Sequence, residues 1–200
     1  MFGKDRSLSQ VLKLISCIIK SLSSCERTGK ADFRGFHREC FKTKKCLLND
    51  PSLSKLSKFA SDAEALSAFI EKIISELDLY EITPGQTPFV LLGGIKPCLM
   101  EIKKHASDSG RSQRSLHRLR TMPPCSDKQA NPAKAKQLLA GLCKELHAAK
   151  LGAAGAKSDF IGNLKFSGIY SKFELCLFHL ENMIEITLEL KNRSPDTHSV

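Results

Sequence analysis

The sequence predicts an all-α fold, a bundle of four main helices with shorter helices and long connections. Several segments repeat apolar residues at the spacing of an amphipathic helix, and one C-terminal segment is apolar on most sides of a helix. Strictly alternating runs, which mark strands, are few, and the 200 residues contain no Trp and only two Tyr. A chain of this length can bury one good core, so a second full domain is not expected.

The C-terminal segment 167–190 reads SGIYSKFELCLFHLENMIEITLEL. One stripe of the helix consists of Phe173, Cys176, Leu177, Leu180, Ile184 and Leu188. The apolar residues that cover much of the remaining surface are Leu175, Phe178, Met183, Ile186 and Leu190. Such a helix is normally enclosed by others, so we expect Leu177, Leu180 and Ile184 to be nearly fully buried. Polar residues interrupt the run too often for a membrane span, and none is expected.

Two further helices are predicted in the N-terminal half. Residues 33–48 place Phe33, Phe36, Cys40 and Phe41 at core positions and a basic face opposite, and the Asn-Asp-Pro sequence at 49–51 ends the helix. A second helix begins with Ser61 and Glu64 at capping-box spacing. Its apolar stripe is Leu66, Phe69, Ile70, Ile73, Ile74 and Leu77, and TPGQTP at 83–88 ends it.

The C-terminal half alternates shorter pieces with one long helix. FVLLGGI at 89–95 is predicted to be a packed connector because of its two glycines and the nearby Pro97, and residues 98–105 form a shorter helix. Asn131 caps a helix with Pro132 at its first position. The buried face of that helix is Ala135, Leu138, Leu139, Leu142, Cys143 and Leu146. Residues 150–159 are expected to be a flexible linker and 193–200 a flexible tail.

Two interpretations of the N-terminus stay open. Lys4 and Arg6, an apolar stretch at 11–19 and small residues at 21–24 are typical of a signal peptide covering residues 1–24, which would leave a secreted helical domain at 25–192. Lys13 and Lys20 interrupt the apolar stretch. The other interpretation is an amphipathic first helix, whose apolar residues are Leu8, Val11, Leu12, Ile15, Ile19 and Leu22.

The formal net charge of +10 favours anionic partners such as nucleic acid, sulfated glycans, acidic membranes or acidic proteins. The basic residues predicted to bind a polyanion are Lys103, Lys104, Arg111, Arg114, Arg118 and Arg120. No aromatic residue lies among them, so base stacking is not indicated. We expect charge-driven binding, for example to a glycosaminoglycan, without sequence preference.

No pattern of residues indicates an enzyme, a metal site or a cofactor. The eight cysteines include no C-x-x-C pair. Cys25, His37, Cys40 and Cys46 lack the spacing of a zinc site, and LLGGI lacks the glycine pattern of a phosphate-binding loop. We therefore expect a binding protein without catalytic residues, metal or cofactor.

Four segments resemble the interleukin-10 family of class II helical cytokines. FRGFHRECFKTKKCLLNDP (33–51) would be its first receptor-facing helix. GIYSKFELCLFHLENMIEI (168–186) is similar to the last helix of that family, and EALSAFIEKIISEL (64–77) to its third helix. LHRLRTMPPCSDKQANPAKAKQLLAGL (116–142) resembles its leucine- and arginine-rich helix, Pro-Cys turn and following helix, and is also similar to interferon-lambda. The segments occur in the family's order. The chain departs from it by lacking a cysteine at the start of the third helix.

The resemblance implies a cytokine-type bundle, secreted and bound by a heteromeric cell-surface receptor. One receptor surface would combine the first receptor-facing helix, the loop after it and the last helix, through Arg34, Arg38, Lys42, Lys45, Glu181 and Glu185. The resemblance also implies a disulfide between Cys25 and Cys125. It leaves open whether the protein is a monomer or an intertwined dimer. The alternative hypothesis is an intracellular basic helical protein, viral or regulatory, that binds nucleic acid or an acidic protein in the cytoplasm or nucleus.

Overall fold

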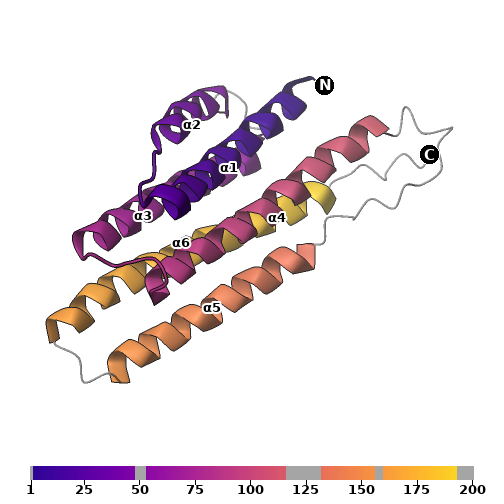
Figure 1. Ribbon diagram of the computed structural model, residues 1–200. Helices are drawn as coiled ribbons and strands as arrows, with labels where there is room; N and C mark the ends of the chain where they lie inside the picture. The colour runs from indigo at the N-terminus through magenta and orange to yellow at the C-terminus, as the bar shows by residue number, and fades with distance from the viewer. Residues whose placement is uncertain (1, 48–52, 116–131, 156–159, 193–200) are drawn as a thin grey trace.

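The computed structural model describes residues 2–47, 53–115, 132–155 and 160–192 and confirms the all-α prediction (Figure 1). No strand occurs within these ranges. The helices are α1 (Phe2–Thr28), α2 (Arg34–Leu47), α3 (Ser54–Leu79), α4 (Thr87–Ser115), α5 (Pro132–Gly155) and α6 (Phe160–Asn192). Five of them are long and α2 is short.

Ion pairs between neighbouring helices establish the direction of each helix. Lys55, at the start of α3, pairs with Glu189 at the end of α6, and Glu76, at the end of α3, pairs with Lys172 near the start of α6. These two helices are therefore antiparallel. Figure 1 shows the same reversal between α1 and α4, α4 and α5, and α5 and α6, which are joined by the pairs Glu26–Lys96, Glu101–Lys134 and Lys150–Glu174.

The chain consequently reverses direction at every helix, as Figure 1 also shows. Helices α1 and α3 are parallel to each other, and α4 and α6 run the opposite way. These four enclose the core, since α1 packs on α3, α3 on α6, α6 on α4 and α4 on α1. Helix α2 covers the edge between α1 and α3, and α5 covers the edge between α4 and α6.

Helix α1 contributes to the centre of this core. Its residues Val11, Leu14, Ile15, Ile18 and Leu22 are each at most 2% exposed. The stripe shares Val11, Ile15 and Leu22 with the predicted amphipathic helix, whereas Leu8, Leu12 and Ile19 are only partly buried. The segment Leu8–Thr28 also has the length and hydropathy of a membrane span, a property that signal sequences and buried core helices share.

Helix α6 packs against α3, α4 and α5. Leu177, Leu180 and Ile184 are 9%, 0% and 2% exposed, which confirms their predicted burial. The helix is nevertheless not enclosed on all sides, because Leu175 and Phe178 are 43% and 55% exposed. The apolar residues of α6 therefore lie partly in the core and partly on an exposed face of the helix.

Helix α3 begins at Ser54, seven residues before the predicted capping box at Ser61. Leu56, Phe59 and Ala60 are buried and extend the apolar stripe toward the N-terminus. The gain from burying these side chains continues the helix through Ser61, so the capping-box prediction is wrong.

Helix α4 runs unbroken through FVLLGGI and Pro97, so the predictions of a packed connector and a separate short helix are wrong. Its buried stripe is Leu91, Leu92, Ile95, Cys98, Leu99 and Ile102. Pro97 lies on the exposed side of this helix. Gly94 faces α5, where a Cβ atom would lie only 2.2 Å from Cδ2 of Leu142. This glycine therefore serves close packing between two helices rather than a turn.

Three smaller predictions also change. Helix α5 continues to Gly155, so residues 150–155 are helical rather than part of a flexible linker. Cys143 and Phe41 are predicted to lie on buried faces but are exposed, because Cys143 lies at the margin of the apolar stripe of α5 and Phe41 lies on the outer side of α2. The predicted tail, 193–200, lies outside the described residues.

Candidate functional site

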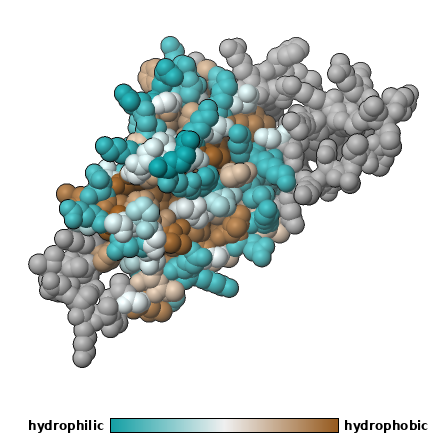
Figure 2. Space-filling model, in the orientation of Figure 1, coloured by the Kyte–Doolittle hydropathy of each residue, from teal (hydrophilic) through white to brown (hydrophobic). Residues whose placement is uncertain are grey.

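A groove of about 750 Å³ lies between α5 and α6. Its apolar lining includes Leu139 and Leu146 from α5 and Leu177 and Ile184 from α6, all buried, together with the half-exposed Phe178. The groove forms because α5 rests on α4 as well as on α6 and leaves one side of α6 uncovered. On the face of the molecule that Figure 2 shows, patches of apolar surface lie between hydrophilic residues.

The two walls of the groove carry opposite charges. Helix α5 contributes Lys136, Lys144, Lys150 and His147, and α6 contributes Glu174, Glu181 and Glu185. Lys150 pairs with Glu174 and bridges the groove at one end. The other two lysines and two glutamates have no ion-pair partner among the described residues.

Cys143 lies in this groove with an exposed thiol. Its pKa is raised above the usual thiol value, first by partial burial and then by the negative charge of Glu181. Both effects disfavour the thiolate, which is the nucleophilic form of cysteine. The groove has the character of a binding surface.

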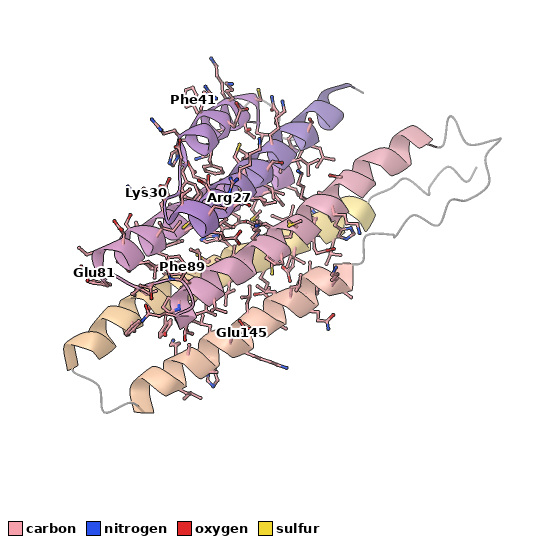
Figure 3. The ribbon with its side chains drawn as sticks, viewed as in Figure 1. Arg27, Lys30, Phe41, Glu81, Phe89 and Glu145 are labelled. Atoms are coloured by element: carbon pink, nitrogen blue, oxygen red, sulfur yellow. The ribbon has the colours of Figure 1, made fainter. Side chains whose placement is uncertain are left out.

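The basic residues predicted to bind a receptor lie on the outer side of α2. Arg34, Arg38, Lys42 and Lys45 are all exposed. Arg34 pairs with Asp32 at 3.1 Å and Lys42 with Glu39 at 2.9 Å, whereas Arg38 and Lys45 have no such partner in the described part of the chain. Phe41, 73% exposed, projects from the same side of the helix (Figure 3).

The other two predicted receptor residues, Glu181 and Glu185, are exposed but lie in the groove between α5 and α6. Helix α2 covers the opposite edge of the bundle, against α1 and α3 (Figure 1). The structure therefore brings the four basic residues together and places the two glutamates on a separate surface.

The predicted polyanion cluster is only partly described. Lys103 is half-buried and Lys104 exposed on α4. Arg111 and Arg114 belong to the last turns of the same helix. Arg118 and Arg120 lie outside the described residues. Among the cluster's side chains whose burial is described, Lys104 is the exposed one.

A polar cluster between α3 and α6 was not anticipated. Oδ1 of Asp62 lies 2.8 Å from Nδ1 of His179 and accepts a hydrogen bond of 3.2 Å from Nδ2 of Asn182. Phe69 stacks on the imidazole with ring centroids 5.9 Å apart. The only signal in the sequence was the pair of polar residues within the apolar C-terminal helix. The cluster joins two core helices, α3 and α6.

The described cysteines are all free thiols: Cys17, Cys25, Cys40, Cys46, Cys98, Cys143 and Cys176. Burial raises the pKa of Cys98, with a smaller contribution from Cys143, and that of Cys176, in each case to about 12. Cys25 is buried, and its proposed partner Cys125 lies outside the described residues, so the disulfide stays a prediction. No group of three or more His, Cys, Asp or Glu side chains that could hold a metal ion occurs in the described ranges.

Comparisons with family models, with curated proteins and with solved structures found no match for this chain. Its function must therefore be inferred from its own fold and surfaces.

Proposed function

We propose that the protein is a helical cytokine, secreted, that signals by binding a heteromeric class II cytokine receptor at the cell surface. The observation that carries this proposal is the direction of the four core helices. Helices α1 and α3 run one way, α4 and α6 the other, and each parallel pair is joined by a crossover that contains a further helix. An up-up-down-down bundle with two long crossovers is the arrangement of growth-hormone and cytokine bundles.

The receptor contact is assigned to the outer surface of α2, formed by Arg34, Arg38, Lys42, Lys45 and the exposed Phe41. Protein interfaces draw much of their affinity from a few arginines and aromatic residues surrounded by polar contacts. Two of these cations are unpaired in the described structure and are available to an acidic partner. Glu181 and Glu185, which lie on a separate surface, are not part of this contact.

In this proposal residues 1–24 remain part of the folded protein. Cleavage after residue 24 would remove Val11, Leu14, Ile15 and Ile18 from the core, and one of the four core helices would be lost. Deletion of residues 1–24 should therefore abolish cooperative thermal unfolding measured by circular dichroism. A truncated chain that unfolds cooperatively at the temperature of the full chain would support the signal-peptide interpretation instead.

The receptor assignment is tested with the purified full chain and immobilised ectodomains of class II cytokine receptor chains. We expect one ectodomain to bind, and Arg38→Glu with Lys45→Glu to weaken that binding at least tenfold. Lys104→Glu, a charge reversal on α4, is the matched control and should leave the affinity unchanged. Binding to no ectodomain, or equal loss in the control, would contradict the assignment.

A second candidate is an intracellular basic protein that binds nucleic acid or an acidic protein. Two observations favour it: the free thiols of the seven described cysteines, which suit a reducing compartment, and the packing of α1 in the core. Cell fractionation separates the candidates. The cytokine is recovered from the medium, and the rival from the cytosol or nucleus with salt-sensitive binding to nucleic acid.

A further inference from the structure

The groove between α5 and α6 is unusual because its charges are sorted by helix. The α5 wall carries only lysines and a histidine, and the α6 wall carries only glutamates. Between the walls lie apolar side chains, of which Phe178 is 55% exposed. A partner for this surface must supply an apolar stripe with acidic groups on one flank and basic groups on the other.

The charges also match in height along the groove. Lys150 and Glu174 are paired, and the two helices are antiparallel. Counting from that pair at about 1.5 Å per residue, Lys144 lies about 9 Å and Glu181 about 10.5 Å along the groove. By the same count Lys136 lies about 21 Å and Glu185 about 16.5 Å along it. Each remaining lysine therefore has a glutamate at a similar height on the opposite wall.

We infer that the occupant of this groove is a second copy of the same chain, in a symmetric dimer. A two-fold axis parallel to the helices, passing along the groove, places α5 of one protomer opposite α6 of its partner. It leaves the height of every residue unchanged, so the lysine wall of each protomer meets the glutamate wall of the other. A surface used twice in this way is the isologous interface of a C2 dimer.

The apolar residues support the same arrangement. The four helices that meet at the axis form a small bundle of their own, and Phe178 and Cys143 from both protomers lie within it. Packing there removes from water the half-exposed phenyl ring on α6, while the charges form the rim, as in a typical interface. Within one protomer Lys150 pairs with Glu174, whereas Lys136 and Lys144 form no ion pair with Glu181 or Glu185.

The predicted dimer is weak. The lining spans residues 136–150 of α5, about 21 Å of helix, and two helices side by side are about 20 Å wide. An interface of that size is near the lower limit for specific association, so the dimer should form at micromolar rather than nanomolar concentrations.

A charge-exchange experiment tests the dimer through sedimentation equilibrium of the full chain. The wild type should dimerise, whereas Glu181→Lys and Lys144→Glu should each be monomeric over the same concentrations, with dissociation constants raised at least tenfold. An equimolar mixture of the two variants should regain association, because the surface with added lysine then faces the surface with added glutamate. Glu145→Lys is the control, since Glu145, labelled on α5 in Figure 3, is exposed and does not line the groove, and this variant should dimerise as the wild type does.

Several results would overturn the inference: a monomeric wild type at hundreds of micromolar, unaltered dimerisation of Glu181→Lys, or a mixture that stays monomeric. Circular dichroism of each variant shows whether it is folded, and Phe178→Ser, a change at an exposed position, provides a second route to a monomer. The inference does not depend on the proposed function. If the α2 surface binds a receptor, the dimer carries two such surfaces, and failure of either assay leaves the other interpretable.

Discussion

The two crossover helices perform the same task on opposite edges of the bundle and do so differently. Helix α2 has 14 residues and covers the edge between α1 and α3. It turns Phe36 and Cys40 inward, and Phe33 just before it is also buried. A hydrogen bond between His37 and Glu71 and an ion pair from Lys44 to Glu64 hold it to α3. Its inner side is closed and its outer side is basic.

Helix α5 has 24 residues and covers the edge between α4 and α6. It contains no aromatic residue and approaches α4 closely at Gly94 and Leu142. Against α6 it leaves a groove with Phe178 half exposed. Aromatic side chains fill the space beneath α2, whereas small and aliphatic side chains beneath α5 leave apolar surface open. The basic outer side of α2 therefore suits a polar contact with an acidic partner. The apolar groove between α5 and α6 suits the proposed dimer.

The largest effect is expected on the α2 edge. Phe36→Ala should lower the free energy of unfolding by about 3–5 kcal/mol, because it leaves a cavity where a ring 1% exposed was packed. Chemical denaturation measures the loss. Phe41→Ala, five residues along the same helix but 73% exposed, should cost less than about 0.5 kcal/mol. Similar losses for both would mean that α2 is not packed on the bundle through Phe36.

On the α5 edge, the neighbouring glycines Gly93 and Gly94 form a matched pair. An added Cβ meets nothing within 4 Å at Gly93, so Gly93→Ala should stabilise the protein by up to about 1 kcal/mol through helix propensity. Gly94→Ala would collide with Leu142 and should destabilise by about 1–2 kcal/mol as an overpacking change.

The same pair of helices offers a double-mutant cycle. In a Leu142→Ala background the collision disappears, and Gly94→Ala should become stabilising, as Gly93→Ala is. Denaturation of the four proteins gives the coupling energy. If Gly94→Ala changed the free energy of unfolding in the same direction in both backgrounds, α4 and α5 would not approach closely at this position.

Smaller effects are expected from the ion pairs that hold each edge. Lys44–Glu64 joins α2 to α3, and Lys150–Glu174 joins α5 to α6. All four side chains are more than a third exposed, so each pair should contribute less than about 1 kcal/mol in a double-mutant cycle. Both couplings should shrink in 1 M salt. A coupling that withstands that salt would identify a pair shielded from solvent.

The smallest change concerns two thiols, Cys40 on α2 and Cys143 on α5. Cys143 is exposed and should react with iodoacetamide in the native protein, while the buried Cys40 should react only after unfolding. The pKa of Cys143 is raised, first by partial burial and second by Glu181. Glu181→Gln removes a negative charge that opposes the thiolate, so it should lower this pKa and speed alkylation near pH 8. An unchanged rate-against-pH profile would place Glu181 away from the thiol.

The sequence alone determined that the protein is helical and identified much of its core. Apolar residues at helical spacing were enough to locate Ile70 and Ile73 on α3 and Leu180 and Ile184 on α6, because burial of a continuous stripe is the main reason that a helix forms in a protein. Charge likewise indicated the basic outer side of α2, since unpaired cations are kept in water.

Tertiary structure decided what periodicity cannot show. The glycines of LLGGI suggested a connector, but they lie in a helix because Gly94 admits Leu142 of α5 from a distant part of the chain. Phe178 belongs to an apolar pattern, yet it is half exposed because the placement of α5 leaves that side of α6 open. Glu181 and Glu185 face the lysines of α5 rather than α2 for the same reason. A side chain's exposure depends on which helices pack beside its own, and one helix's pattern does not contain that information.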